Sequence, residues 1–234
     1  MRRKARLGLA LVGLTAALAV SGCSVVSGPA VQEDRGIDEV TGLELRTGGD
    51  VTVLRGEPLL TVSAPDAALG RLTSDVRDGR LVLSTTRGAT WIRGSIGYTL
   101  QVDHLDEVTV KGSGNVRGSG ITGSDLVIHV QGSGDVDLAG VDADRLEVVI
   151  EGSGNVRLDG RAGDVNISVA GSGNVDLDGL RATRSAVQIA GSGNVRVDVS
   201  DALDVRIAGS GDVTYTGDPS LSSQVTGSGD IRRG

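Results

Sequence analysis

Aromatic residues are nearly missing from this 234-residue chain, which contains one Trp, two Tyr and no Phe. A hydrophobic core must therefore be built from Val, Leu, Ile and Ala, whose narrow or β-branched side chains suit thin, stacked β-strands. The same shortage argues against a carbohydrate site built on aromatic stacking platforms. The three aromatic residues are Trp91, Tyr98 and Tyr215.

Cysteine and histidine are equally scarce, with one Cys and two His. A single thiol, Cys23, allows no intramolecular disulfide and no thiolate cluster for a metal ion. His104 and His129 are the only histidines, and the serines that recur along the chain have no base beside them that could activate a hydroxyl nucleophile. We therefore expect no catalytic residues, no metal site and no cofactor.

The first 22 residues are expected to be a secretion signal. Basic residues open the chain, and an apolar run of 14 residues follows from Leu7 to Val20, which is shorter than the roughly 20 residues that span a membrane. Val20-Ser21-Gly22-Cys23 resembles the bacterial lipobox, in which the cysteine is diacylated and becomes the new N-terminus. We predict that Cys23 is lipidated and that residues 23–35 form a tether. The alternative is an incidental thiol near an ordinary cleavage site.

Positive charge is in short supply once this segment is removed. Cleavage would take away four basic residues and no acidic one, which leaves 19 Lys and Arg against 30 Asp and Glu, a net charge of −11. Such an acidic surface disfavours nucleic acid and anionic head groups. The lipid would therefore be the link to the membrane. We expect an exported protein on the outer face of the cytoplasmic membrane, or on the outer membrane of a Gram-negative cell.

Glycine, by contrast, is abundant, and much of it belongs to a repeat. Seven times between Gly112 and Ile231 the chain reads Gly-Ser-Gly, then Asn or Asp, then Val or Ile. A fixed period in this range is typical of a solenoid, in which each rung buries its apolar side against its neighbours. The copies begin at Gly112, Gly132, Gly152, Gly171, Gly191, Gly209 and Gly227, in steps of 20, 20, 19, 20, 18 and 18 residues.

Apolar residues alternate with polar ones on both sides of each Gly-Ser-Gly, which indicates two short strands per rung with one face inward. The Gly-Ser-Gly would form the corner between them, where glycine reaches backbone angles closed to other residues. We predict an all-β, single-domain parallel β-solenoid with about 18–20 residues per rung over residues 112–234.

Charge alternates at the fifth residue after the first Gly of successive copies. In an in-register parallel stack with strands about 4.8 Å apart, these side chains would form a column, and each opposite-charge pair would contribute roughly 0.2–1 kcal/mol. The predicted charge ladder is Arg117, Asp137, Arg157, Asp176 and Arg196, followed by Thr214 and Arg232.

The polar residue after each Gly-Ser-Gly is expected to cap the corner by accepting backbone N–H groups, with the Asn amides stacking rung on rung. The alternative is calcium binding, although the calcium β-roll repeats every nine residues and needs more carboxylates. A file of aspartates at the seventh position, Asp159, Asp178 and Asp198, is the better place to look for a cation. The predicted corner ladder is Asn115, Asp135, Asn155, Asn174, Asn194, Asp212 and Asp230.

Residues 36–111 show strand character with less regularity and are expected to form irregular rungs and a cap. Pro65 to Asp75 is predicted to be a short helix or turn over one end of the rod. At the other end, the strand at Ile231 would leave an edge open to self-pairing. The strands expected before the repeats are Val40–Leu45, Asp50–Leu54, Leu59–Ser63, Arg80–Thr85, Ser95–Val102 and Glu107–Val110.

The lipobox, the Gly-Gly-Asp-Val at Gly48–Val51, the Asp-Gly-Arg-Leu at Asp78–Leu81 and the serial Gly-Ser-Gly-Asn/Asp-Val together resemble one bacterial family, the autotransporter adhesin head or GIN domain. The resemblance covers roughly residues 36–231. It implies a right-handed parallel β-solenoid in the cell envelope, and it supplies no catalytic residues.

Three kinds of function are compatible with such a rod. The first is an envelope-anchored lipoprotein with a non-catalytic, adhesion-like binding surface for envelope or extracellular macromolecules. The 12-residue tether from Ser24 to Arg35 has a root-mean-square span near 20 Å, which favours a membrane-proximal scaffold or signalling accessory as the alternative. A polysaccharide-processing enzyme is less expected, because no carboxylate pair or long loop is evident. A self-assembling rod is the third kind, and the oligomeric state stays open.

Overall fold

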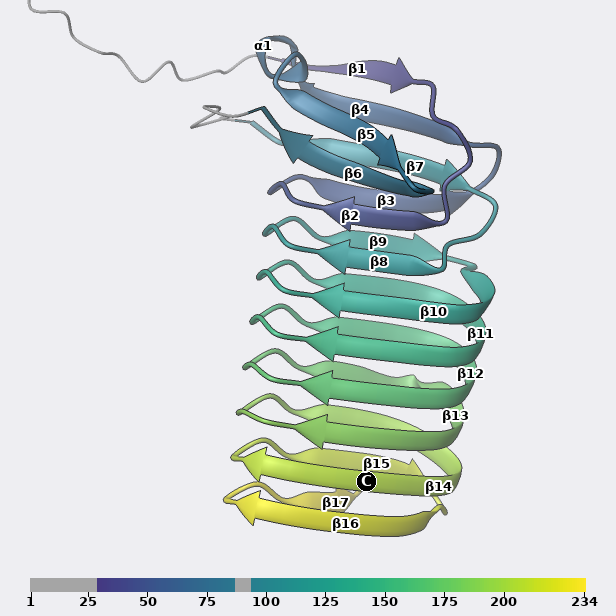
Figure 1. Cartoon of the computed structure of the whole chain (residues 1–234), viewed down its shortest axis with the longest axis vertical. Helices are drawn as coiled ribbons and strands as arrows, with labels where there is room; N and C mark the ends of the chain where they lie inside the picture. The colour runs from purple at the N-terminus through teal and green to yellow at the C-terminus, as the bar shows by residue number, and fades with distance from the viewer. Residues whose placement is uncertain (1–28, 87–93) are drawn as a thin grey trace, which may run out of the picture.

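The protein is a flattened rod made of one continuous β-sheet that curls into two facing layers (Figure 1). The computed structural model describes residues 29–86 and 94–234, and this part of the chain contains 17 strands and a single short helix. Strands that run into the Gly-Ser-Gly corners form what we call the front layer, and strands that leave the corners form the back layer. The predicted β-solenoid is therefore confirmed.

The regular rungs are held together by parallel, in-register pairing of strands about 20 residues apart. Val136 pairs with Val156, Val156 with Val175, and Val175 with Val195, so equivalent positions of the repeat lie in straight columns. The first of the regular strands covers only the bend and the front layer, and each of the others runs through the back layer, bends at the edge opposite the Gly-Ser-Gly corner and returns in the front layer. These strands are β10 (Thr122–Val130), β11 (Val136–Ile150), β12 (Val156–Val169), β13 (Val175–Ile189) and β14 (Val195–Gly209).

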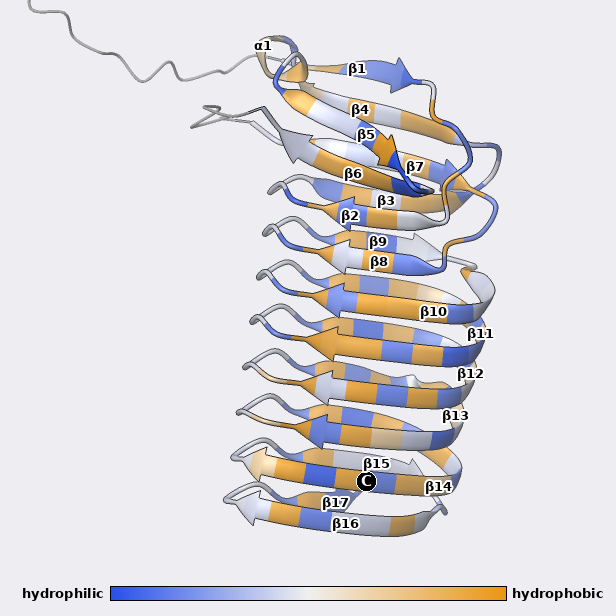
Figure 2. Ribbon diagram, in the orientation of Figure 1, coloured by the Kyte–Doolittle hydropathy of each residue, from blue (hydrophilic) through white to orange (hydrophobic). Residues whose placement is uncertain are grey.

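The core is the narrow space between the two layers and is filled by columns of Val, Leu and Ile. Val148, Val156 and Val205 are fully buried. Burial of each such side chain stabilises the fold by roughly 1.5–3 kcal/mol. Figure 2 shows the corresponding alternation of hydrophobic and hydrophilic residues along every regular strand. Two thin layers therefore suffice, because Val, Leu and Ile fill most of these columns.

At most corners glycine is required because of space, and not because of the backbone angle that the sequence suggested; in the last two corners Gly209 and Gly227 also have positive φ, at 149° and 128°. Gly152 and Gly154 do not have positive φ. A Cβ on Gly152 would lie 2.0 Å from the carbonyl oxygen of Gly132, one rung away. Close approach of the two backbones lets the Ser153 N–H donate to that same oxygen at 3.1 Å. Positive φ does occur at the opposite, bent edge, where Gly140 and Gly160 have φ values of 63° and 126°.

The irregular N-terminal part forms the first rungs in an unexpected spatial order. The rung of β2 (Gly42–Leu45) and β3 (Asp50–Arg55) lies between two rungs that follow it in sequence. On one side lie β6 (Arg80–Thr85) and β7 (Gly97–Val102), and on the other lie β8 (Glu107–Val110) and β9 (Val116–Ser119). The chain thus leaves the stack after β3, builds the end of the rod, and returns to continue it.

Antiparallel strands close this end of the rod. β4 (Leu59–Pro65) pairs with β7, β1 (Ala30–Arg35) pairs with β4, and β5 (Leu72–Arg77) pairs with β6. The four-residue helix α1 (Asp66–Leu69) lies beside them at the tip (Figure 1). Val62, Ala64 and Leu69 of this cap are buried in the core.

The six strands expected before the repeats are present, with boundaries within two residues of those predicted. Two expectations were wrong. Residues 30–35 form β1 and are not tether, because their backbone pairs with β4. The helical segment ends at Leu69, and Leu72–Arg77 is a strand that pairs with β6 through an Asp78-Gly79 turn with φ values of 51° and 73°.

The other end of the rod consists of β15 (Val213–Gly217), β16 (Ser220–Gly227) and β17 (Ile231–Arg233). β16 pairs in parallel with the front half of β14, and β17 pairs with β15. Tyr215 and Ile231 pack against the last core residues. In residues 29–86 and 94–234 no helix has the length and hydrophobicity needed to cross a membrane.

The corner geometry predicts that Gly152→Ala is strongly destabilising. Its Cβ would collide with the Gly132 carbonyl group, so the rungs must separate, at a cost of about 3 kcal/mol or more. Urea unfolding followed by circular dichroism measures the effect. Gly70→Ala is the control, because nothing lies within 4 Å of its Cβ position and its φ is −66°. An unchanged unfolding midpoint for Gly152→Ala would contradict the corner model.

Candidate functional site

The Asn and Asp residues that follow each Gly-Ser-Gly form a continuous chain of hydrogen bonds along the rod. The Asn155 N–H and its Nδ2 both donate to Oδ1 of Asp135, at 2.8 and 2.9 Å. Asn174 makes the same two bonds to Oδ1 of Asn155, at 3.1 and 2.9 Å. The pattern runs through all seven predicted positions, Asn115, Asp135, Asn155, Asn174, Asn194, Asp212 and Asp230.

The ladder begins one rung earlier than the repeat predicted. Asp50 accepts hydrogen bonds from the N–H and Nδ2 of Asn115, at 2.9 and 2.8 Å. This rung could have been found from the Gly-Gly-Asp-Val at Gly48–Val51, which matches the end of the corner motif, although the first half of the motif is altered there. Where Asp follows Asn, as at Asp135 and Asp212, only the backbone bond forms, because a carboxylate has no N–H to donate. At Asp212 and Asp230 two carboxylates stack directly.

The predicted charge ladder lies in one column on the back layer. Successive members pair directly in the strand registers. Only one ion pair in the column is within 4 Å among the described residues, between Arg157 and Asp176 at 3.4 Å. The column aligns Arg117, Asp137, Arg157, Asp176 and Arg196, followed by Thr214 and Arg232.

Two stronger charge columns, which the sequence did not reveal, flank the bent edge. In one, Arg145 contacts Asp125 at 3.1 Å and Arg184 contacts Asp164 at 2.6 Å. The hydrogen bond from Arg184 lowers the pKa of the Asp164 carboxyl. These residues pair in the order Asp125, Arg145, Asp164 and Arg184.

The second column lies on the opposite flank of the same edge. Arg161 Nε donates to Asp142 Oδ1 at 2.7 Å, and this hydrogen bond lowers the pKa of the Asp142 carboxyl. Asp142 pairs with Arg161, Arg161 with Arg181, and Arg181 with Asp198.

The file of aspartates considered for a cation does not form. Strand registers shift at the bent edge, so Asp159 pairs with Gly179 and Asp198 pairs with Arg181. Asp178 falls inside one of these irregularities and pairs with neither. Asp159 is instead used structurally, because its Oδ1 accepts the Gly140 N–H at 2.7 Å. Within the described ranges, no group of three or more His, Cys, Asp or Glu is arranged to hold a metal ion.

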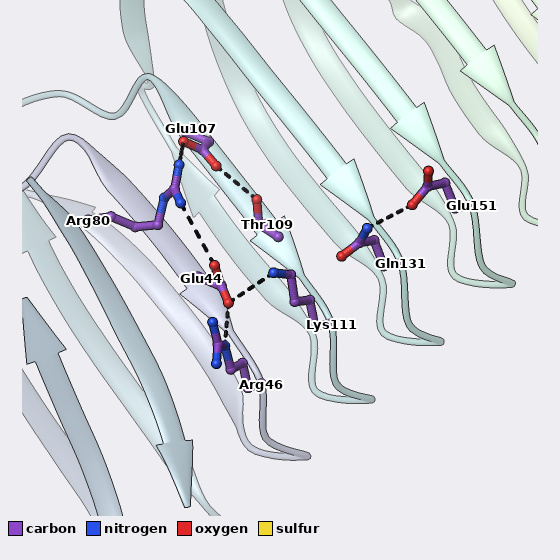
Figure 3. Close-up of polar contacts among 8 residues, drawn as sticks. All are labelled: Glu44, Arg46, Arg80, Glu107, Thr109, Lys111, Gln131 and Glu151. Carbon is purple, nitrogen blue, oxygen red and sulfur yellow. Dashed lines mark hydrogen bonds and ion pairs between the residues drawn. The ribbon is translucent and has the colours of Figure 1, made fainter. Parts of the chain in front are cut away.

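A cluster of charged residues covers the front layer where the irregular rungs meet the regular ones (Figure 3). Glu44 on β2 is at its centre and is buried, with 3% of its surface exposed. Arg46 hydrogen-bonds its carboxylate, Lys111 Nζ lies 3.2 Å from it and Arg80 Nη1 3.9 Å. Arg80 also pairs with Glu107. We call these five residues the Glu44 cluster.

Electrostatics keep Glu44 ionised in this position. Burial by itself would raise the pKa of its carboxyl, but hydrogen bonds from Arg46 and Lys111, together with their positive charges, outweigh it, so the pKa lies below its ordinary value. The three cations are between 40% and 48% exposed. A buried carboxylate thus holds three cationic groups at a fixed place on the surface.

Beyond the Glu44 cluster the front layer becomes less charged. Glu151 accepts a hydrogen bond from Gln131 at 2.7 Å (Figure 3). It also lies 3.2 Å from His129 Nε2, and the two contacts lower the pKa of its carboxyl. From β12 to β16 the outward columns are mostly small and neutral. They line a shallow hollow of about 280 Å³, whose rim and floor include Ser168, Gln188, Ala190, Arg206, Ala208 and Gln224.

The sequence of the chain matches the model of one known protein family. The model of the family described as "Putative auto-transporter adhesin, head GIN domain" matches residues 39–219. The chain belongs to this family. No curated protein sequence matches the chain. The family match thus extends from just before β2 to the turn that precedes β16, and includes the Glu44 cluster.

Several solved structures share the fold of this chain. A "putative adhesin" from Bacteroides fragilis has 24% identity and a TM-score of 0.85, with 89% of this chain and 99% of that chain covered. A "putative lipid binding protein" from Parabacteroides distasonis has 23% identity and a TM-score of 0.73, with 90% and 98% covered. A "putative adhesin" from Parabacteroides merdae has 19% identity and a TM-score of 0.71, with 90% and 98% covered. At these identities the likeness concerns the fold of the GIN domain.

The predicted lipidation site, Cys23, and the signal segment at residues 1–22 lie outside the described residues. The described part of the chain begins at Pro29, one residue before β1.

Glu44→Gln is expected to destabilise the GIN domain by about 2 kcal/mol at pH 7, because the three surrounding cations lose their buried counter-charge. The folded-state pKa of Glu44 is lowered, so its contribution is fully present above the unfolded-state pKa of about 4.3 and is lost as pH falls through the folded-state value. Wild type and variant should therefore begin to converge as the pH falls below the unfolded-state value, and should coincide below the folded-state pKa of Glu44. Urea midpoints measured from pH 3 to pH 8 check this.

The control is Glu151→Gln on the same face, whose side chain is 51% exposed. Its midpoint should change far less than that of Glu44→Gln, because contacts of an exposed carboxylate contribute little to stability. A pH-independent difference between wild type and Glu44→Gln would show that the cluster acts through packing alone.

The corner ladder predicts opposite effects for two exchanges. Asn155→Asp removes the Nδ2 donor to Asp135 and places two carboxylates in contact, so it should destabilise the fold by up to about 1 kcal/mol at pH 7 and low salt. Asp212→Asn adds a donor toward Asn194 and relieves the repulsion from Asp230, so it should stabilise by a similar amount. Thermal unfolding of both variants, with and without added salt, measures the two signs. Shifts of equal sign would contradict the ladder.

Proposed function

We propose that this GIN-domain protein is an exported lipoprotein whose solenoid is a non-catalytic, adhesion-like binding surface. The observation that carries this proposal is the front layer itself. Its outward side chains stand in straight columns fixed by in-register backbone pairing. A rigid face with repeated polar groups suits many weak contacts made simultaneously, and such contacts add up to strong binding.

The arrangement of side chains supports binding more than catalysis. Glu44 and Glu107 are the paired carboxylates of the cluster, and both are engaged by cations. Their pairing keeps the lowered pKa of Glu44 far from that of a general acid. The solved relatives described as adhesins and as a lipid-binding protein are consistent with a binding role. A polysaccharide-processing enzyme has no comparable support.

Anchoring would hold the rod close to its membrane. If Cys23 carries the lipid, the free tether is Ser24 to Pro29, because β1 begins at Ala30. Six residues span at most about 20 Å when fully extended. The capped end, where β1 lies, would then face the membrane. This short reach favours partners in the cell envelope, and it is the specific observation behind the second candidate function, a membrane-proximal scaffold or signalling accessory.

The lipid anchor is tested with Cys23→Ser in the native host. Wild-type protein is expected to incorporate a labelled fatty acid and to sediment with membranes. The variant should lose the label, because the diacylated thiol is gone. Ser24→Ala is the matched control and should keep the label. Full labelling of Cys23→Ser would remove lipidation at this residue from the proposal.

The binding role needs its own measurement. Cells that lack the gene should attach less well to matrix or cell-wall material, and the full-length protein should restore attachment. The purified protein should also bind envelope or matrix material. If the protein restores attachment but binds none of this material, the scaffold function is favoured instead.

A further inference from the structure

The end of the rod opposite the cap has an edge strand without the usual protection. All eight residues of β16 (Ser220–Gly227) are exposed, and none is charged or proline. β16 pairs with β14 along one edge, and within the described part of the chain its other edge has no partner strand. Proteins commonly blunt such edges with charges, proline or a covering segment, because free strand edges pair with other strands.

The two ends of the rod differ in this respect. The outermost strands of the cap, β1 and β5, each carry charged residues, with Glu33, Asp34 and Arg35 on β1 and Asp75 and Arg77 on β5. β1 and β5 are also antiparallel to their neighbours, so they interrupt the parallel stack. The cap end is therefore guarded against strand addition, and the β16 end is not.

The inward side chains of β16 have the positions of core residues. Leu221 pairs with Leu203, and Val225 pairs with Ile207, so both continue columns that are buried in every other rung. Each is nevertheless 42% exposed. Together with Leu54 they are the exposed large hydrophobic residues of the described chain. Another strand placed beside β16 would bury them.

We propose that this end of the rod is a homophilic contact, in which β16 pairs antiparallel with β16 of a second copy. In an antiparallel pair, opposite residues point to the same side of the sheet. A two-fold axis at Ser223 would place Leu221 opposite Val225 of the partner, and Val225 opposite Leu221 of the partner. Inward residues would then meet inward residues, and the apolar columns of the two rods would join. Such a contact is isologous and closed, so it forms dimers rather than filaments.

Charge favours a second copy as the occupant. The processed chain would carry a net charge of −11, counted as 19 basic against 30 acidic residues, which opposes most contacts between copies. β16 brings no charge to the contact. In the back layer, the two arginines of β17 are paired within their own copy, Arg232 with Asp230 at 2.9 Å and Arg233 with Asp218 at 3.2 Å. A contact through β16 thus adds no like charges of its own to the repulsion between two copies.

The contact would place the two caps at opposite ends of a doubled rod. If the lipid anchor of the proposed function is correct, the anchors would point away from each other. Molecules in two facing membranes could then bind tip to tip, and neighbours in one membrane could not. This consequence rests on the proposed function, whereas the dimer itself does not.

Sedimentation equilibrium of the full-length processed protein, purified from membranes in detergent, tests the dimer. Wild-type protein is expected to be dimeric at micromolar concentration. Leu221→Lys combined with Val225→Lys should weaken dimerisation at least tenfold, because it introduces like charges into the contact. Leu54→Lys is the matched control, since Leu54 is 41% exposed on β3, and it should leave the dimer intact. Circular dichroism must show that the variants are folded.

The register is tested by cross-linking. Ser223→Cys should form a disulfide between copies, because the two Ser223 residues face each other across the axis. Ser222→Cys should not, because it is one position off the axis. A wild-type monomer up to about 100 μM, or equal cross-linking at both positions, would overturn the proposal. Absence of a fatty-acid label on the wild-type protein, with the dimer retained, would overturn the lipid anchor only.

Discussion

The fold depends on how closely successive rungs approach each other at the Gly-Ser-Gly corner. The glycine carbonyl of one rung occupies the place where a side chain of the next would begin, with hypothetical Cβ-to-oxygen distances of 1.9–2.2 Å along the regular corners. This contact sets the spacing that every other column inherits. The Asn and Asp ladder beside it needs the same spacing, because Oδ1 of one rung must reach both the N–H and the Nδ2 of the next. The buried columns and the surface ladder therefore have the same spacing between rungs.

Periodicity explains why much of the rod could be predicted. Once seven corners are aligned, Val136, Val156 and Val175 must stack, and the charge column that contains Arg157 and Asp176 follows from counting five residues onward. Counting fails at the bent edge, where rungs differ in length and the register shifts. Asp159 and Asp198 leave their file there, and the pairing of Asp164 with Arg184 becomes visible only in the structure. The cap was missed in part because β1 is rich in charge, a composition typical of a tether.

Glu44 marks a second limit of sequence reasoning. Alternation places it outward on β2, and an outward Glu on a strand reads as solvent-exposed. The structure buries it because β2 lies between β6 and β8, which are distant from it in sequence. Arg80 lies on β6, and Lys111 directly follows β8. The chain reaches this arrangement only by leaving the stack after β3 and returning at β8. No local pattern encodes that path, so the Glu44 cluster could not be foreseen from spacing.

The two ends of the rod show what a solenoid must solve apart from its repeat. A stack of identical rungs has no intrinsic stop, so each end needs a separate device. At the cap this device consists of the reversal of strand direction, the charged edge strands and helix α1, none of which carries the repeat. At β16 the apolar columns of Leu203 and Ile207 run on to Leu221 and Val225 without interruption. An end built from the repeat itself has the same shape and chemistry as the interior of the rod. It is therefore complementary to another rung, and a second copy offers one of matching width.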